Sequence, residues 1–161
     1  TVTRQGSRTV YTPQIMLDGQ DIRQTRFESS LRDITSRPAR AALTLNTQTV
    51  ANAIEVSLNV NVPDTEERKN SALYIAVTEN NLVSQVTAGE NRGVTLKHDH
   101  VVRELLGPIA MRAEGALDIK RSIAIPPAWK RENLQIAAFV QNQQNGAVAQ
   151  AVSTPLCVAG R

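Results

Sequence analysis

The sequence predicts a mainly β protein, in which an antiparallel β-sandwich of about seven strands follows a short β–β–α segment. Three observations support this prediction. Apolar and polar residues alternate with a period of two over most of the chain after residue 40, as in strands with one buried and one solvated face. Turn signals such as Asn145-Gly146 separate these stretches. Before residue 40, one segment spaces its apolar residues with a helical period.

The N-terminal 40 residues predict a strand, a turn and one helix. The apolar run at residues 15–17 is a short strand closed by the turn signal Asp18-Gly19. Thr25 and Glu28 have the spacing of a capping box, in which each side chain satisfies the other's free backbone N–H. The helix ends before Pro38, since the residue before a proline avoids the α region. Three residues form the apolar stripe of this helix: Phe27, Leu31 and Ile34.

The sandwich strands follow from the alternation after residue 40. The clearest strand is residues 54–62, where every second residue is Ile, Val or Leu. Residues 63–70 predict a charged loop, and Asn80-Asn81 predicts a tight hairpin turn. Gly107-Pro108 is expected to end a strand. The other expected strands are 43–45, 73–77, 82–87, 96–106, 119–125, 134–140 and 147–153.

Composition excludes several function classes. Of the 161 residues, 41% are hydrophobic and 3% aromatic, and the formal net charge is +3. Few aromatic rings argue against a single-stranded nucleic-acid site, which depends on stacking. Acidic residues interrupt the arginines near residues 23–40, which favours a solvated helix face over a nucleic-acid surface. No stretch approaches about 20 apolar residues, so we expect no membrane span.

The two histidines, His98 and His100, are a candidate metal pair. On a strand, residues two apart share a face, and such a pair could ligate zinc or copper. The alternative is a hydrogen-bonded structural patch. Asp99 and Arg103 belong to the same polar cluster, which we interpret as structural rather than as a base with its orienting group. No nucleophile motif accompanies them, so we expect no catalytic residue and no cofactor.

Two other side chains are candidate sites. Cys157 is the single cysteine, so the chain holds neither an internal disulfide nor a C-x-x-C pair, and an inert thiol is expected. Trp129 follows Pro126-Pro127. We expect this tryptophan to cap one end of the sandwich core rather than to serve as an exposed binding anchor.

Three segments together resemble a known family. They are residues 10–19, which include Thr12-Pro13-Gln14 and the following turn, residues 89–103, and the hairpin of residues 138–151. Together they resemble the secreted bacterial domain-of-unknown-function family 1223, related to outer-membrane-associated thioredoxin-like proteins. In that family, a thioredoxin-like half with a C-x-x-C motif precedes a β-sandwich half. The resemblance implies a periplasmic or secreted protein.

The resemblance also implies domain boundaries and roles. Residues 1–40 would be the C-terminal piece of a thioredoxin-like domain, and residues 41–161 the β-sandwich domain. Pro13 would be the cis-proline and Thr12 the residue before it, where the backbone of a protein substrate would pair. The half with the two cysteines would precede Thr1 and be the main partner of this chain. Without it we expect an exposed edge or apolar patch, which a homodimer could cover.

Two functions remain open from the sequence. One is an accessory and interaction domain of an exported thioredoxin-like protein, with the thiol–disulfide chemistry in the missing N-terminal half. The other is a stand-alone periplasmic binding module for a protein, metal or ligand, without redox activity. A metal-dependent enzyme built on His98, Asp99 and His100 is a third and weaker interpretation. The first two expect no catalysis from this chain alone.

Overall fold

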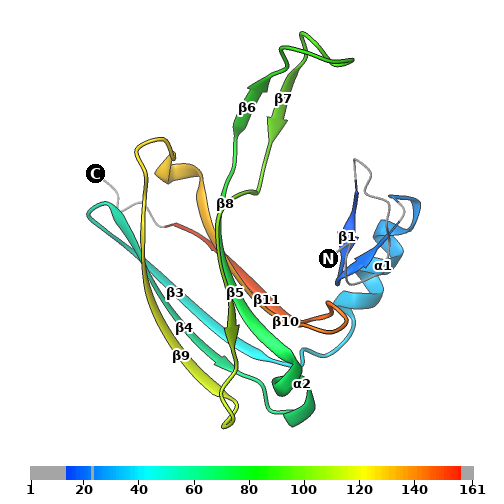
Figure 1. The fold of residues 1–161 in the computed structure, drawn as a ribbon, viewed down its shortest axis with the longest axis vertical. Coiled ribbons are helices and arrows are strands. Elements are labelled where there is room, and N and C mark those ends of the chain that lie inside the picture. The colour runs from blue at the N-terminus through cyan, green and yellow to red at the C-terminus, as the bar shows by residue number, and fades with distance from the viewer. Residues whose placement is uncertain (1–13, 23, 157–161) are drawn as a thin grey trace.

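A β-sandwich of two antiparallel sheets forms the centre of the protein (Figure 1). The structure is a computed structural model that describes residues 14–22 and 24–156. One sheet has four strands in the order β11-β10-β5-β8, and the other has three in the order β3-β4-β9. The predicted mainly β fold, with about seven strands in the sandwich, is confirmed. Two further strand pairs, β1-β2 and β6-β7, lie outside the sandwich.

The strand bounds agree closely with the alternation in the sequence. The four-stranded sheet consists of β5 (Ser71–Glu79), β8 (Val101–Ala110), β10 (Leu134–Asn142) and β11 (Val148–Pro155). The three-stranded sheet consists of β3 (Ala42–Val50), β4 (Ala53–Asn61) and β9 (Ala116–Ala124). Gly146, at φ +82, lies between β10 and β11, so the predicted turn at Asn145-Gly146 is confirmed.

One apolar core fills the space between the two sheets. Every second residue of β4 is buried, and Ile54 and Val60 are completely inaccessible. Ile136 and Val140 of β10 belong to the same core and are also completely buried. Their polar neighbours along each strand point away from it, because successive side chains of a strand alternate between faces.

Strand β5 is buried over almost its whole length, unlike the alternating strands around it. Of its residues, only Tyr74 is partly exposed. The strand lies between β10 and β8, and its outer side carries small residues such as Ala76, which pairs with Ala137 and Leu105 on the two neighbours. Burial on both faces produces a nearly continuous apolar run, so periodicity is a weaker signal here.

The N-terminal segment forms a small unit, which we call the ββα unit (residues 14–37). It consists of β1 (Met16–Leu17), β2 (Gln20–Asp21), a 3₁₀ turn (Gln24–Arg26) and α1 (Phe27–Thr35). The predicted helix is confirmed, but the capping box is wrong. The helix begins after Arg26, whose side chain makes no capping hydrogen bond, and Thr25 lies within the preceding 3₁₀ turn.

The expected loop at residues 63–70 contains a second short helix, α2 (Thr65–Asn70). The Asp64 carboxylate caps it by accepting a hydrogen bond from the Glu67 N–H at 2.7 Å. Sequence periodicity missed the helix because its six residues include no apolar stripe. Across the described residues, no helix has the length and apolar character to cross a membrane.

A two-stranded hairpin projects from one end of the sandwich (Figure 1). We call residues 82–98 the arm. Its strands are β6 (Leu82–Gln85) and β7 (Thr95–His98), and they pair with each other. The predicted hairpin turn at Asn80-Asn81 is therefore wrong, because β6 leaves β5 instead of pairing with it.

The predicted strand at residues 96–106 is divided in the structure. Asp99-His100 separates β7 from β8, and Val101 then pairs with Glu79 of the sandwich. At the other end, Gly107-Pro108 was expected to stop the strand. Instead β8 continues to Ala110, with a cis peptide bond between these two residues.

Candidate functional site

The base of the arm gathers the polar residues that the sequence singled out. Strands β5 and β8 pair last at Glu79 and Val101, and the chain pairs again at Leu82 and His98. Between these two pairs, on opposite strands, Asn81 (φ 56) and His100 (φ 54) have left-handed backbone conformations. Asn and His occupy this region more readily than most residues. The arm therefore leaves the sheet through a pair of matched turns.

Reciprocal hydrogen bonds brace these turns. The Asp99 Oδ1 accepts the Asn81 N–H at 2.8 Å, and the Asn80 Oδ1 accepts the His100 N–H at 2.8 Å. Each strand thus satisfies a backbone donor that its partner can no longer satisfy. The Asn80 N–H also donates to the Asn133 carbonyl at 3.0 Å, which ties the base of the arm to the start of β10. The Asp99 carboxylate therefore helps to hold the two turns at the base of the arm together.

The expected geometry of the histidine pair is wrong. His98 ends β7, whereas His100 lies in the turn before β8, so they are not alternate residues of one strand. Among the described residues, no group of three or more His, Cys, Asp or Glu side chains is arranged to hold a metal ion. Metal binding by His98 and His100 stays a prediction that would need ligands from elsewhere.

A buried ion pair lies directly below the arm. The Glu79 carboxylate is completely buried, and its Oε2 lies 3.0 Å from the Arg103 Nε. These two atoms are close, but the N–H does not point at the oxygen, so the contact is an ion pair without a hydrogen bond. The other oxygen, Oε1, accepts the Lys130 N–H at 3.0 Å. The Arg103 guanidinium carbon lies 5.6 Å from the centre of the Trp129 ring.

We call these four residues the end cluster: Glu79, Arg103, Trp129 and Lys130. Trp129 packs against the edge of the core, where it was expected as a cap. The arginine lies between a carboxylate and an aromatic face, two environments that stabilise a guanidinium. Sequence reasoning missed Glu79, although a lone acid at the end of an apolar strand was the available signal.

The ββα unit joins the sandwich through two turns that pack on each other. The Asp18 Oδ1 accepts the Val148 N–H at 2.5 Å. A Cβ added to Gly19 would lie 2.3 Å from the Gly146 carbonyl oxygen, so only glycine permits this backbone approach. The two turn signals predicted separately in the sequence therefore form one contact. Asp18 also lies 3.7 Å from Arg37, at the far end of the unit.

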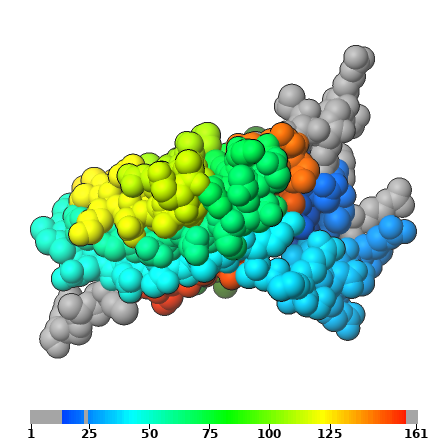
Figure 2. Space-filling model, turned by 90° about the horizontal axis from the view of Figure 1, so that it is seen from below, coloured from blue at the N-terminus to red at the C-terminus, as the bar shows by residue number. Residues whose placement is uncertain are grey.

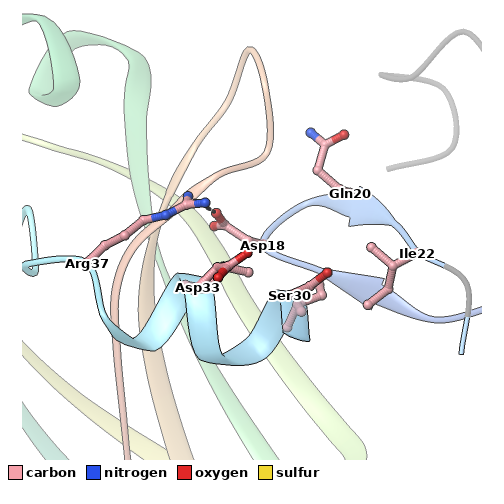
Figure 3. A pocket seen from close by; sticks show the side chains of 8 residues that line it. Asp18, Gln20, Ile22, Ser30, Asp33 and Arg37 are labelled. Carbon is pink, nitrogen blue, oxygen red and sulfur yellow. Dashed lines mark ion pairs between the residues drawn. The ribbon is translucent and has the colours of Figure 1, made fainter. Parts of the chain in front are cut away.

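A small open pocket of about 210 Å³ lies between the β1-β2 pair and α1 (Figure 3). Figure 3 shows Arg37 reaching across one end of this pocket toward Asp18. Ser30 and Asp33 of α1 and Ile22 of the preceding segment also line it. Because its arginine already pairs with Asp18, we interpret this pocket as a seam between hairpin and helix.

Two apolar side chains of the helix in the ββα unit are only partly covered. Phe27 is 37% exposed and Leu31 38% exposed, and α1 contains no buried residue. Figure 2, seen from below, shows residues of this unit in blue as a lobe at one end of the sandwich. Each of these two side chains is therefore nearly two-thirds covered, and the apolar patch expected for this segment stays a prediction.

The outer face of the four-stranded sheet forms a second apolar surface. Tyr74 and Phe139, neighbours on β5 and β10, stack with ring centres 5.1 Å apart. Val102 and Leu105 on β8 are more than half exposed. We call this surface the uncharged face because its outward positions, given by strand register, carry no charged residue. They are Ala72, Tyr74, Ala76, Thr78, Val102, Leu105, Ala110, Gln135, Ala137, Phe139, Gln141, Val148, Ala151, Ser153 and Pro155.

The outer face of the three-stranded sheet has the opposite character, and we call it the polar face. It carries short hydrogen-bonding and charged side chains in rows across the strands: Thr44, Asn46, Gln48, Glu55, Ser57, Asn59, Asp118, Lys120 and Ser122. The Asn59 amide donates to Asp118 at 2.7 Å, and the Ser122 hydroxyl donates to Glu55 at 2.5 Å. Side-chain hydrogen bonds therefore join β4 and β9 at two positions of this face.

Three residues with predicted roles lie outside the described residues. They are Thr12 and Pro13, expected at the substrate backbone, and Cys157, the single thiol. Their roles stay predictions.

The geometry defines a β-sandwich domain with a projecting arm and an attached ββα unit. The chain belongs to the family described as "Protein of unknown function (DUF1223)", which matches residues 1–141. The resemblance to this family drawn from the sequence is therefore confirmed, whereas its thioredoxin-like half stays a prediction. No curated protein matches the chain.

Two solved structures from Porphyromonas gingivalis have a similar fold. HBP35 superimposes with a TM-score of 0.63 and 19% identity, over 80% of this chain and 45% of that chain. A domain of the outer membrane lipoprotein Omp28 superimposes with a TM-score of 0.53 and 17% identity, over 74% of this chain and 90% of that chain. At such identities the likeness shows the fold alone. The chain spans less than half the length of HBP35.

Proposed function

We propose that this chain is the accessory and interaction domain of an exported thioredoxin-like protein, and that its ββα unit completes an N-terminal half. The observation that carries this proposal is the state of the unit itself. A helix of nine residues with no buried side chain is attached to strands of two residues each. Residues 14–22 and 25–37, the part of this unit whose side chains the structure describes, include no buried side chain.

Physical considerations favour a partner for this unit. An isolated two-stranded hairpin is marginal in water without further strands or packing. Among the described residues, β1 and β2 form a sheet of two strands only. Phe27 and Leu31 of α1 are each more than a third exposed. A sheet that continued from β1 under this helix would enlarge the two-stranded hairpin and cover the two apolar side chains.

The thiol chemistry would belong to the N-terminal half. Thiol–disulfide exchange needs an attacking thiolate and a disulfide, and this sequence holds one cysteine. In this proposal the sandwich supports the redox half and shapes access to it, and Thr12-Pro13 would contact substrate backbone. The name of the Omp28 neighbour, an outer membrane lipoprotein, supports an envelope or secreted location for this chain as well.

The test is made on the product of the native gene. Its intact mass is measured with and without reduction and alkylation. We expect a product heavier than 17.6 kDa with two cysteines that switch between thiol and disulfide. Hydrogen exchange of α1 should be slow in that product and fast in the present chain, while β4 is equally protected in both. A product with Cys157 as its single thiol would contradict the proposal.

The uncharged face favours an alternative function, a stand-alone binding module without redox activity. An apolar surface of this extent is typical of a protein contact. Zinc or copper titration followed by calorimetry would test the metal version of this alternative, with His98→Ala as the comparison. Saturable metal binding that is lost in this variant would support a metal-binding module. If the unmodified chain bound neither metal, this version of the alternative would be wrong.

A further inference from the structure

We propose that the uncharged face binds the same face of a second copy of this chain, which forms a two-fold symmetric dimer through the four-stranded sheets. This inference goes beyond the proposed function, because it rests on the sandwich alone. The ββα unit and its exposed Phe27 and Leu31 would stay available for the N-terminal half.

The absence of charge is the first argument for a second copy. In a two-fold interface the same patch meets itself, so each side chain lies near copies of its neighbours. A patch with a net charge of either sign would repel its own copy. The outward positions of the uncharged face carry no Asp, Glu, Lys or Arg. The polar face, by contrast, carries three charged residues at its outward positions, Glu55, Asp118 and Lys120.

The chemistry of the remaining side chains is the second argument. Interface centres are enriched in Tyr and Phe and depleted in charged residues, and the Tyr74–Phe139 stack lies in the middle of this face. The polar residues here are Gln, Thr and Ser, which both donate and accept hydrogen bonds. Gln135 and Ser153 could therefore pair with equivalents in a partner, whereas a carboxylate could not.

The shape and size of the face are the third argument. Alanines at positions such as Ala137 and Ala151 leave room for a second sheet, which packs about 10 Å away when two apolar faces meet. Four strands about 4.8 Å apart and about 30 Å long give about 570 Å² in projection. Two such faces would together bury about 1,100 Å², which is just above the about 1,000 Å² that a specific interface needs.

The experiment measures the mass of the present chain in solution by light scattering and sedimentation over a range of micromolar concentrations. We expect a dimer of twice 17.6 kDa. Ser153→Glu is the main variant, because Ser153 is exposed at the surface of β11 and the substitution should not affect folding. Placing a buried carboxylate at the interface twice should weaken the dimer by about 100-fold or more.

The matched control is Ser57→Glu, the same substitution on the polar face, which should leave the dimer intact. Leu105→Glu, at the other edge of the uncharged face, is a second variant with the same expected loss. Circular dichroism and thermal melting confirm that each variant is folded. A wild-type chain that is monomeric at every concentration would overturn the proposal. So would a dimer that Ser153→Glu and Leu105→Glu leave unchanged, or one that Ser57→Glu disrupts.

The outcome is independent of the proposed function. Hydrogen exchange of α1 in the native gene product tests whether an N-terminal half covers the ββα unit. The mass of the present chain in solution tests whether the uncharged face forms a dimer. If the native product is a monomer in which β8 and β10 gain protection, the occupant is its own N-terminal half, and the dimer proposal is wrong while the proposed function stands.

Discussion

The two sheets of the sandwich bury similar inner faces but present different outer faces. The polar face of the three-stranded sheet carries three charged residues and a grid of amides and hydroxyls. The uncharged face of the four-stranded sheet carries an aromatic stack and exposed Val102 and Leu105. Alternation along a strand therefore separates inside from outside. It does not show whether the outside meets water or another protein, which depends on the residues at the outward positions.

The sheets also differ at their ends. The three-stranded sheet closes with a short turn at Ala51-Asn52, where the Asn52 carbonyl accepts the Ile125 N–H at 2.8 Å. The four-stranded sheet ends in the buried Glu79–Arg103 pair and then extends into the arm. This end of the sheet is closed by a buried ion pair rather than by apolar side chains. We therefore expect substitutions here to lower the free energy of unfolding more than substitutions at the other end.

The largest expected effect tests that sensitivity. Arg103→Leu leaves the completely buried Glu79 carboxylate without its cation, and we expect a loss of about 3–5 kcal/mol in the free energy of unfolding. Lys120→Leu, an exposed cation on the polar face, should change stability by less than about 0.5 kcal/mol. Urea unfolding followed by circular dichroism measures both. The double variant Glu79→Leu/Arg103→Leu should recover most of the loss. If Arg103→Leu and Lys120→Leu lowered the free energy of unfolding equally, the buried ion pair would not make this end of the sheet more sensitive.

An intermediate effect tests the aromatic stack. A double-mutant cycle of Tyr74→Leu and Phe139→Leu, measured by urea unfolding at one protein concentration, should give a coupling energy of about 0.5–1.5 kcal/mol. The corresponding cycle on the polar face, Asn59→Ala with Asp118→Ala, should give about 0.2–1 kcal/mol, since this cross-strand pair is exposed. A coupling near zero for the two rings would mean that they contribute only as separate apolar surfaces.

The last expected effect is of similar size but is confined to the base of the arm. Asp99→Ala removes the acceptor of the Asn81 N–H and should lower the local stability of the arm by about 1 kcal/mol, or about fivefold in exchange rate. Hydrogen exchange should report this in β6 and β7 while β10 is unchanged. Asp118→Ala, which removes an exposed acceptor from the polar face, is the control and should leave the arm unaffected. Faster exchange throughout the sandwich in Asp99→Ala would contradict a local role.

Local chemistry in the sequence determined most of the sandwich. The strands around residues 54–62 and 134–140 alternate because one side is dry and the other solvated, and this period is visible without any partner. The turn at Asn145-Gly146 and the apolar stripe of α1 are equally local signals. The family resemblance also depended on the order of short segments, and the match over residues 1–141 confirmed it.

Only the tertiary structure decided how these pieces meet. It divided the expected strand at Asp99-His100, separated β6 from β5, and brought Glu79 to Arg103 and Trp129. It also placed Gly19 against Gly146, two turns from opposite ends of the chain. The physical reason is the same in each case. Periodicity records whether a residue faces a core, whereas pairing between distant residues depends on shape and charge that arise only when the chain is folded.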